Sequence, residues 1–136
     1  MDIFEKYQLS FIKDDNGRPE GVSKLYPVLE NVLFSFRDSL SEILKNTIEY
    51  KSLVSSNPME NNKKGMVSDN EYYKYWEQIN KLDYFGSDES SLNLYNSEVA
   101  LSYSGNEFCI MPIEDFIKIL EEWKMFLKEN YGYKFD

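Results

Sequence analysis

The sequence predicts a single α+β domain over residues 1–136, in which an antiparallel β-meander packs against a long N-terminal helix and a C-terminal helix. Its 136 residues are a common size for one domain, and 42% of them are hydrophobic. Apolar residues recur at spacings of three and four in two segments, which is the period of a helix with one buried face. Between these segments, residues 91–111 alternate and contain two short polar joints, as in a meander.

The N-terminal part is expected to hold one strand and one long helix. Residues 7–13 alternate as a strand does, and residues 14–21, DDNGRPEG, supply turn chemistry. From Lys24 the apolar period becomes that of a helix, with Pro27 in its first turn. The buried stripe of this helix is expected to consist of Val28, Leu29, Val32, Leu33, Phe36, Leu40, Ile43 and Leu44.

The middle of the chain is expected to contain a loop and a shorter helix. Residues from about 51 to 67 are rich in Ser, Asn, Pro and Gly and show no period, which favours a mobile loop. Ser68 and Glu71 have the spacing of a capping box. We therefore predict a second helix that begins there and ends near Leu82.

The meander is expected to consist of strands at residues 91–95, 98–103 and 107–111. Because successive side chains of a strand point to opposite faces, alternation sorts these residues into two sets. The set expected to face the helices is Leu92, Leu94, Val99, Leu101, Phe108 and Ile110. The set expected to face away is Asn93, Tyr95, Glu98, Ser102 and Glu107.

The C-terminal helix has signals at both ends. Pro112 stands at its first turn, and Glu114 and Asp115 lie near the positive end of the helix dipole. Gly132 is a stop signal. The buried stripe is expected to be Ile113, Phe116, Ile117, Leu120, Trp123 and Leu127.

The residue types exclude most catalytic chemistry. The chain has no histidine and one cysteine, so it cannot form a Ser-His or Cys-His pair or complete a structural zinc site. Cys109, in the apolar context FCIM, is expected to be a buried thiol. We therefore expect no catalytic residue, no metal site, no cofactor and no enzymatic activity.

Charge and hydropathy exclude further classes. The net charge is −9, and Arg18 and Arg37 are the only arginines, so nucleic acid is not expected as a ligand. No apolar run approaches the length of a membrane span, and the first residues, MDIFEKYQLS, are acidic where a secretory signal is basic. These features predict a cytoplasmic protein without a membrane partner.

The negative charge is concentrated in one segment. Residues 82–117 contain no lysine or arginine, whereas the rest of the chain is close to balance. The acids of this segment are Asp83, Asp88, Glu89, Glu98, Glu107, Glu114 and Asp115. Glu114 precedes Lys118 by four residues, a spacing that predicts a helix-stabilising pair.

A face of carboxylates and tyrosines can bind a basic protein surface, because tyrosine supplies contact area and carboxylates steer association and pair with Arg or Lys. The alternative is that this segment is the solvated outer face of an antiparallel sheet. A tyrosine-rich stretch of the predicted second helix adds rings that one helix face cannot bury. The residues expected to bind a partner are Asp83, Tyr84, Asp88, Glu89, Tyr95, Glu98, Glu107, Tyr72 and Tyr75.

A polar meander followed by CIMPIEDFIKILEEWKMFL ends this short acidic chain. In about its last 55 residues the chain resembles immunity proteins of bacterial polymorphic-toxin and contact-dependent growth inhibition systems. The resemblance implies a small cytosolic inhibitor that binds a toxin domain, often a basic nuclease, and blocks it without chemistry. It carries over no functional residue, because binding surfaces in these families differ from pair to pair.

Two other functions remain open at this point. The chain could be an acidic mimic of nucleic acid that inhibits a DNA-binding enzyme, which requires carboxylates spaced like phosphates. It could also be an enzyme that uses paired carboxylates and a divalent metal, since this chemistry does not need histidine.

Overall fold

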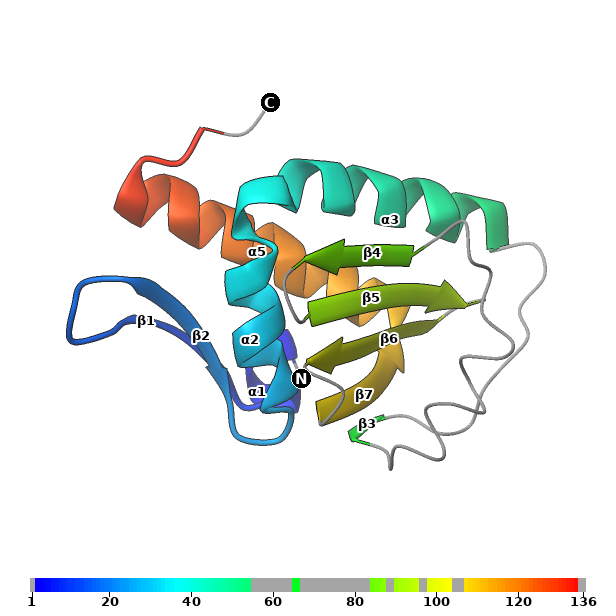
Figure 1. Cartoon of the computed structure of the whole chain (residues 1–136), viewed down its shortest axis with the longest axis horizontal. Helices are drawn as coiled ribbons and strands as arrows, with labels where there is room; N and C mark the ends of the chain where they lie inside the picture. The colour runs from blue at the N-terminus through cyan, green and yellow to red at the C-terminus, as the bar shows by residue number, and fades with distance from the viewer. Residues whose placement is uncertain are drawn as a thin grey trace.

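The computed structural model describes residues 2–54, 65–66, 84–87, 90–95, 98–103 and 107–134. It contains helices and two antiparallel sheets, which confirms the α+β class (Figure 1). The elements, in chain order, are α1 (Ile3–Lys6), β1 (Leu9–Lys13), β2 (Pro19–Ser23), α2 (Val28–Ser35), the 3-10 turn η1 (Arg37–Ser39), α3 (Leu40–Val54), β3 (Gly65–Met66), β4 (Tyr84–Ser87), β5 (Ser90–Tyr95), β6 (Glu98–Tyr103), β7 (Glu107–Pro112) and α5 (Ile113–Tyr131).

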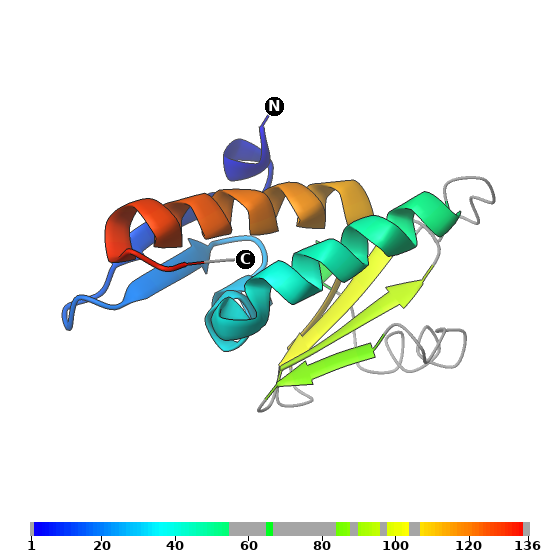
Figure 2. The same cartoon turned by 90° about the horizontal axis from the view of Figure 1, so that it is seen from above.

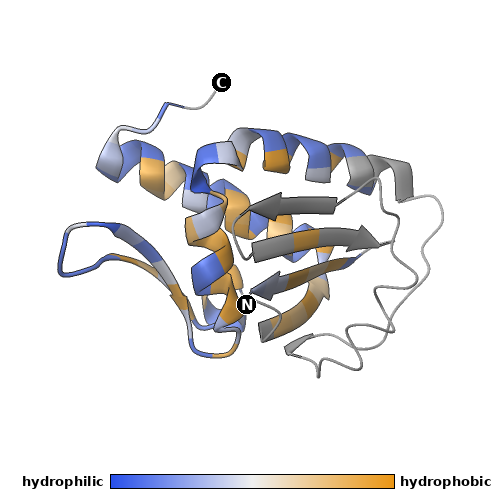
Figure 3. Cartoon of the chain, viewed as in Figure 1, coloured by the Kyte–Doolittle hydropathy of each residue, from blue (hydrophilic) through white to orange (hydrophobic). Residues whose placement is uncertain are grey.

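The larger sheet confirms the predicted meander and adds a strand at each edge. Its order is β3-β7-β6-β5-β4, and all of its neighbouring strands are antiparallel. α2 and α5 pack on one face of it, and their apolar residues gather where they meet the sheet (Figures 1 and 3). The strands near residues 91–111 therefore form as their alternation predicts.

The predicted sorting of side chains is wrong for β7. Leu101 pairs with Cys109 and Val99 pairs with Met111, and residues opposite one another on neighbouring strands share a face. The face that joins the main core therefore carries Cys109 and Met111 rather than the expected residues. The buried side chains of the other face are Glu98, Ala100, Ser102, Phe108 and Ile110. Both faces of β6 are thus shielded from solvent, so polarity along this strand does not identify an outer face.

The single long helix expected from Lys24 is also wrong. α2 ends at Ser35, η1 follows, and α3 begins at Leu40 and runs in a clearly different direction (Figures 1 and 2). As a result, α2 packs against β2 and β6, whereas α3 packs along α5. One continuous apolar stripe of the sequence therefore serves two different surfaces.

Side chains from outside α2 stabilise its end. The last carbonyls of a helix have no hydrogen-bond partner within the helix. The indole Nε1 of Trp123 donates to the carbonyl of Leu33 at 3.0 Å, and the guanidinium of Arg37 donates to the carbonyl of Phe34 at 2.7 Å. Trp123 lies 90 residues beyond Leu33 in the chain, so a local pattern could not reveal this break.

A second strand occupies part of the segment expected to be a turn. β1 and β2 form a two-stranded hairpin, and the turn itself is confined to residues 14–18. The carboxylate of Asp14 accepts hydrogen bonds from the amides of Asn16 and Arg18, both at 2.8 Å. The hairpin projects from the body on the side away from the larger sheet (Figures 1 and 2).

Gly21 of β2 lies against α2 so closely that it leaves no room for a side chain. A Cβ at this position would lie 2.7 Å from Cδ1 of Leu33, which is fully buried. We expect Gly21→Ala to lower the free energy of unfolding by about 1 kcal/mol, because overpacking outweighs the smaller entropy gained in the unfolded chain. Urea unfolding followed by circular dichroism measures this change.

A compensating substitution provides the control for Gly21→Ala. Leu33→Val removes the Cδ atoms that the new methyl group would meet. The double variant should therefore lose less stability than the sum of the two single variants. Additive losses would contradict overpacking as the cause.

The C-terminal helix agrees with its prediction at both ends. Pro112 precedes α5, and Gly132 ends it in the left-handed conformation, with a φ of 66°. All six residues expected in its stripe are buried, and so is Ile119. The predicted loop is wrong at its start, since α3 continues through Val54, and most of that loop and the helix predicted from Ser68 lie outside the described residues.

Candidate partner-binding surface

Most of the residues predicted to bind a partner fall where side chains are not described. Tyr72, Tyr75, Asp83, Asp88 and Glu89 lie outside the described residues. For Tyr84, Tyr95 and Glu107 the structure gives the position in a strand. The remaining residue, Glu98, has a described side chain and can be placed in full.

Strand register separates the predicted surface into two ends of the sheet. Ser87 pairs with Ser90, Ser90 pairs with Tyr103, and Tyr103 pairs with Glu107. Asp88 and Glu89 lie in the link between β4 and β5. The residues that flank this link, Ser87 and Ser90, therefore belong to the same cross-strand row as Glu107. We call the row Ser87, Ser90, Tyr103 and Glu107 the sheet end.

The other predicted residues belong to the opposite end of the same strands. Tyr95 pairs with Glu98, and Glu98 pairs with Pro112. Tyr84 pairs with Asn93, which lies two residues before Tyr95 and so near the same end of the strands. Six-residue strands place the two ends about 17 Å apart. The acidic segment therefore does not form one compact patch around the middle of the meander.

Glu98 is not available to a partner in this fold. It is only 1% exposed, and Ser102 on the same face is buried as well. The prediction that these two side chains point into solvent is wrong. The reason is that the second face of β6 is covered, so the rule of a polar outer face does not apply to this central strand.

Two more acids of residues 82–117 form ion pairs with lysines from distant parts of the chain. Nζ of Lys6 lies 2.6 Å from Oδ2 of Asp115, and the two residues are 109 positions apart. Nζ of Lys51 lies 3.4 Å from Oε1 of Glu114. Glu114 thus pairs with α3 rather than with Lys118 as its spacing predicted. No pattern within residues 82–117 indicates these pairs, because both cations arrive through tertiary packing.

Asp115 is the centre of a polar cluster between α1 and α5. The phenol of Tyr7 donates to the same carboxylate oxygen that Lys6 contacts. Partial burial alone would raise the pKa of Asp115, but hydrogen bonds from Lys6 and Tyr7 outweigh it, so the pKa is lowered. Burial and the bond to Asp115 raise the pKa of Tyr7. This cluster holds the N-terminal helix on α5.

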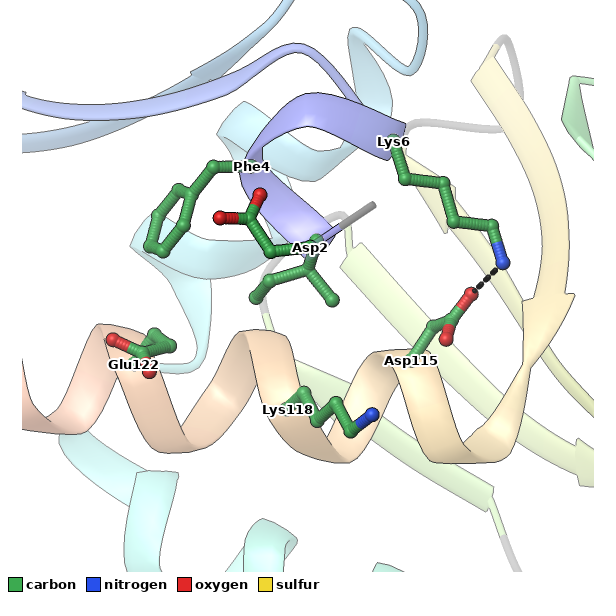
Figure 4. A pocket seen from close by; sticks show the side chains of 7 residues that line it. Asp2, Phe4, Lys6, Asp115, Lys118 and Glu122 are labelled. Carbon is green, nitrogen blue, oxygen red and sulfur yellow. Dashed lines mark hydrogen bonds and ion pairs between the residues drawn. The ribbon is translucent and has the colours of Figure 1, made fainter.

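A cleft of about 280 Å³ lies beside this cluster. Figure 4 shows Lys6 reaching from α1 to Asp115, with Lys118 one turn further along α5. The residues that line the cleft are Asp2, Ile3, Phe4, Lys6, Asp115, Lys118 and Glu122. Its charges are mixed, and Lys6 and Asp115 neutralise each other. Its polar groups thus serve the attachment of α1 to α5.

A second hollow, of about 480 Å³, lies between α3 and α5. Met125 is 53% exposed there and lies among two glutamates and two lysines of α5. The residues that line it are Leu44, Glu121, Lys124, Met125, Lys128 and Glu129. Its balanced charge gives it no preference for a basic partner.

Cys109 and the described acids do not assemble a catalytic group. Cys109 is fully buried, as predicted, and burial raises the pKa of its thiol, so the unreactive protonated form is favoured. Within the described ranges, no three residues among Asp, Glu and Cys are grouped so that they could hold a metal ion. No helix in that part of the chain is long and apolar enough to cross a membrane.

Comparison of the chain with protein families, curated proteins and solved structures returns no match.

Proposed function

We propose that this chain is a non-catalytic, cytoplasmic protein that binds and neutralises a basic toxin domain through the sheet end and the link that contains Asp88 and Glu89. The observation that carries this proposal is the shared cross-strand row of Ser87, Ser90, Tyr103 and Glu107. In this row Ser90, where the link containing Asp88 and Glu89 ends, lies two strands, or about 10 Å, from Glu107. All of these residues belong to the segment that has no basic residue.

The internal ion pairs and the burial of Glu98 narrow the acids that can serve this role. Glu98 is buried, and Glu114 and Asp115 form ion pairs within the chain, so the proposal rests on the other acids of the segment, Asp83, Asp88, Glu89 and Glu107. Three of these four belong to the sheet end and its link. Carboxylates raise the rate of encounter with a basic protein and pair with its Arg or Lys. Tyr103, which is partly buried at the same end, adds a ring that can contact a partner.

The class of partner comes from the resemblance to immunity proteins, whose targets are often basic nucleases. Binding by electrostatic complementarity needs no catalytic group, which agrees with the lack of histidine in the chain. The test uses the C-terminal domain of a large exported protein encoded beside this gene, and asks whether the two proteins form a complex that inhibits that domain.

Charge reversal at the sheet end tests which surface binds. We expect Asp88→Lys, Glu89→Lys and Glu107→Lys together to lower the association rate about 10-fold at low ionic strength. Stopped-flow fluorescence measures this rate, and the difference should shrink in high salt because salt screens exposed charges.

A second triple variant controls for net charge. Asp38→Lys, Glu42→Lys and Glu49→Lys change the charge by the same amount on exposed positions of η1 and α3. This control should change the association rate by about 2-fold or less. Equal slowing in both triples would contradict the assigned surface, and failure of the unaltered protein to bind would remove the proposed function. Competition by duplex DNA for the target would favour the nucleic-acid mimic instead.

A further inference from the structure

The β1–β2 hairpin has one edge that is closed and one that is open. The amide of Asp14 bonds to the carbonyl of Arg18, and the amide of Lys24 bonds to the carbonyl of Gln8. In an antiparallel pair, residues that exchange hydrogen bonds alternate with residues that do not. Ser10 and Ile12 of β1 therefore bond to β2, whereas the backbone groups of Leu9, Phe11 and Lys13 point away from it.

The outer edge of β2 cannot accept another strand. The residues of β2 whose backbone groups point outward are Pro19, Gly21 and Ser23. Proline has no amide hydrogen to donate, and Gly21 and Ser23 are buried. Burial and the proline therefore protect this edge.

The outer edge of β1 is open over three residues. Leu9 is only 4% exposed, so its outward groups are covered, but Phe11 is partly exposed and Lys13 is exposed. Ile12 lies between them and is 44% exposed, with its side chain on the face opposite Phe11. The sheet that contains β1 has no third strand among the described residues.

We propose that two copies of this chain associate by antiparallel pairing of their β1 strands about a two-fold axis at Ile12. In this register, Phe11 of each copy exchanges two backbone hydrogen bonds with Lys13 of the other, because both positions point outward. Ile12 then lies directly opposite Ile12 of the second copy in the closer, non-hydrogen-bonded type of pair. The open edge is thus complementary to itself, and pairing also covers its exposed apolar side chain.

The size and charge of this interface predict a weak dimer. Pairing over residues 11–13 of each copy covers much less than the roughly 800 Å² per partner that is usual in stable complexes. Each copy carries a net charge of −9, which opposes association. We expect a dissociation constant of about 0.1–1 mM, which should decrease as salt screens this repulsion. The proposed toxin complex should respond to salt in the opposite direction.

The test measures sedimentation equilibrium of the purified chain up to about 1 mM, a concentration set by the expected affinity. Lys13→Pro removes an outward amide without removing a hydrogen bond to β2, and should raise the dissociation constant at least 10-fold. Lys13→Ala is the matched control, since it also loses the contact of Lys13 with the ring of Tyr131 but keeps the amide. It should dimerise like the unaltered chain.

A second variant and a residue-specific readout complete the test. Ile12→Glu places like charges opposite each other at an exposed position, so it should weaken the dimer without loss of folding. In NMR spectra, the amide shifts of Phe11 and Lys13 should change with protein concentration, while the amides of Ser10 and Ile12 stay protected from exchange throughout. A monomer at every concentration, or equal dimerisation by Lys13→Pro and Lys13→Ala, would overturn the proposal.

Discussion

Trp123→Ala is expected to lower the free energy of unfolding by about 3–5 kcal/mol, the usual loss when a large buried ring is removed. Trp123 is fully buried, its ring stacks on Phe126 with centroids 5.7 Å apart, and it lies 5.0 Å from the ring of Phe11. Its removal would leave a cavity where α5, α2 and the hairpin meet. Urea unfolding followed by far-ultraviolet circular dichroism measures the loss independently of tryptophan fluorescence.

Trp123→Phe separates the role of the hydrogen bond from that of the ring. Phenylalanine keeps most of the buried surface but cannot donate to the carbonyl of Leu33 at the end of α2. We expect a loss of about 1–3 kcal/mol, since a buried carbonyl would lose its partner. Faster amide exchange in η1 and at the start of α3 should accompany this loss.

The alanine variant has a separate contradicting outcome. If Trp123→Ala lowered the free energy of unfolding by less than about 1 kcal/mol, the ring of Trp123 would not be a main source of stability.

Asp115→Asn is expected to destabilise the protein by about 1.5–3 kcal/mol at neutral pH, because Asp115 accepts hydrogen bonds from a lysine and a tyrosine. The folded state lowers the pKa of Asp115, so the stabilisation is present above the pKa of the unfolded carboxyl, about 3.9, and is lost as pH falls below it. The stability difference between the two proteins should therefore shrink towards pH 3. Thermal unfolding across this range measures it.

Tyr7→Phe gives the complementary test at high pH. Folding raises the pKa of Tyr7, so the unfolded chain ionises first, above about pH 10, and the native protein loses stability there. The phenylalanine variant lacks this contribution to alkaline destabilisation.

The Asp115 test has its own contradicting outcome. If the stability difference between Asp115→Asn and the native protein were unchanged from pH 7 to pH 3, the carboxylate charge would be unimportant to the cluster.

The elements that the sequence predicted correctly are those whose signals are local. The meander follows from alternation and short polar joints, and α5 follows from its apolar period together with Pro112 and Gly132. The buried state of Cys109 follows from its apolar neighbours. Each of these signals spans only a few residues, so nearby contacts are enough to produce the structure.

The errors arise where distant residues decide the outcome. Trp123 donates a hydrogen bond to the carbonyl of Leu33 at the end of α2, and no sequence feature near Leu33 predicts that contact. Gly21 and Pro19 are typical of turns, so the sequence predicts a turn where β2 forms, yet Gly21 is needed for the close approach to α2. Polar character suggested that Glu98 faces solvent, but both faces of β6 are buried.

The α+β class, the order of the meander and the final helix, and the lack of histidine chemistry all follow from the chain before it folds, because composition and period are properties of the chain alone. Tertiary structure decided that Glu98 is buried, which cations pair with Asp115 and Glu114, and which edge of the hairpin is buried. Lys6 and Lys51 pair with Asp115 and Glu114, and the residues of β2 whose backbone groups point outward are buried. Charge and hydrogen-bonding capacity act through space, so only the folded arrangement shows which of these groups are already used.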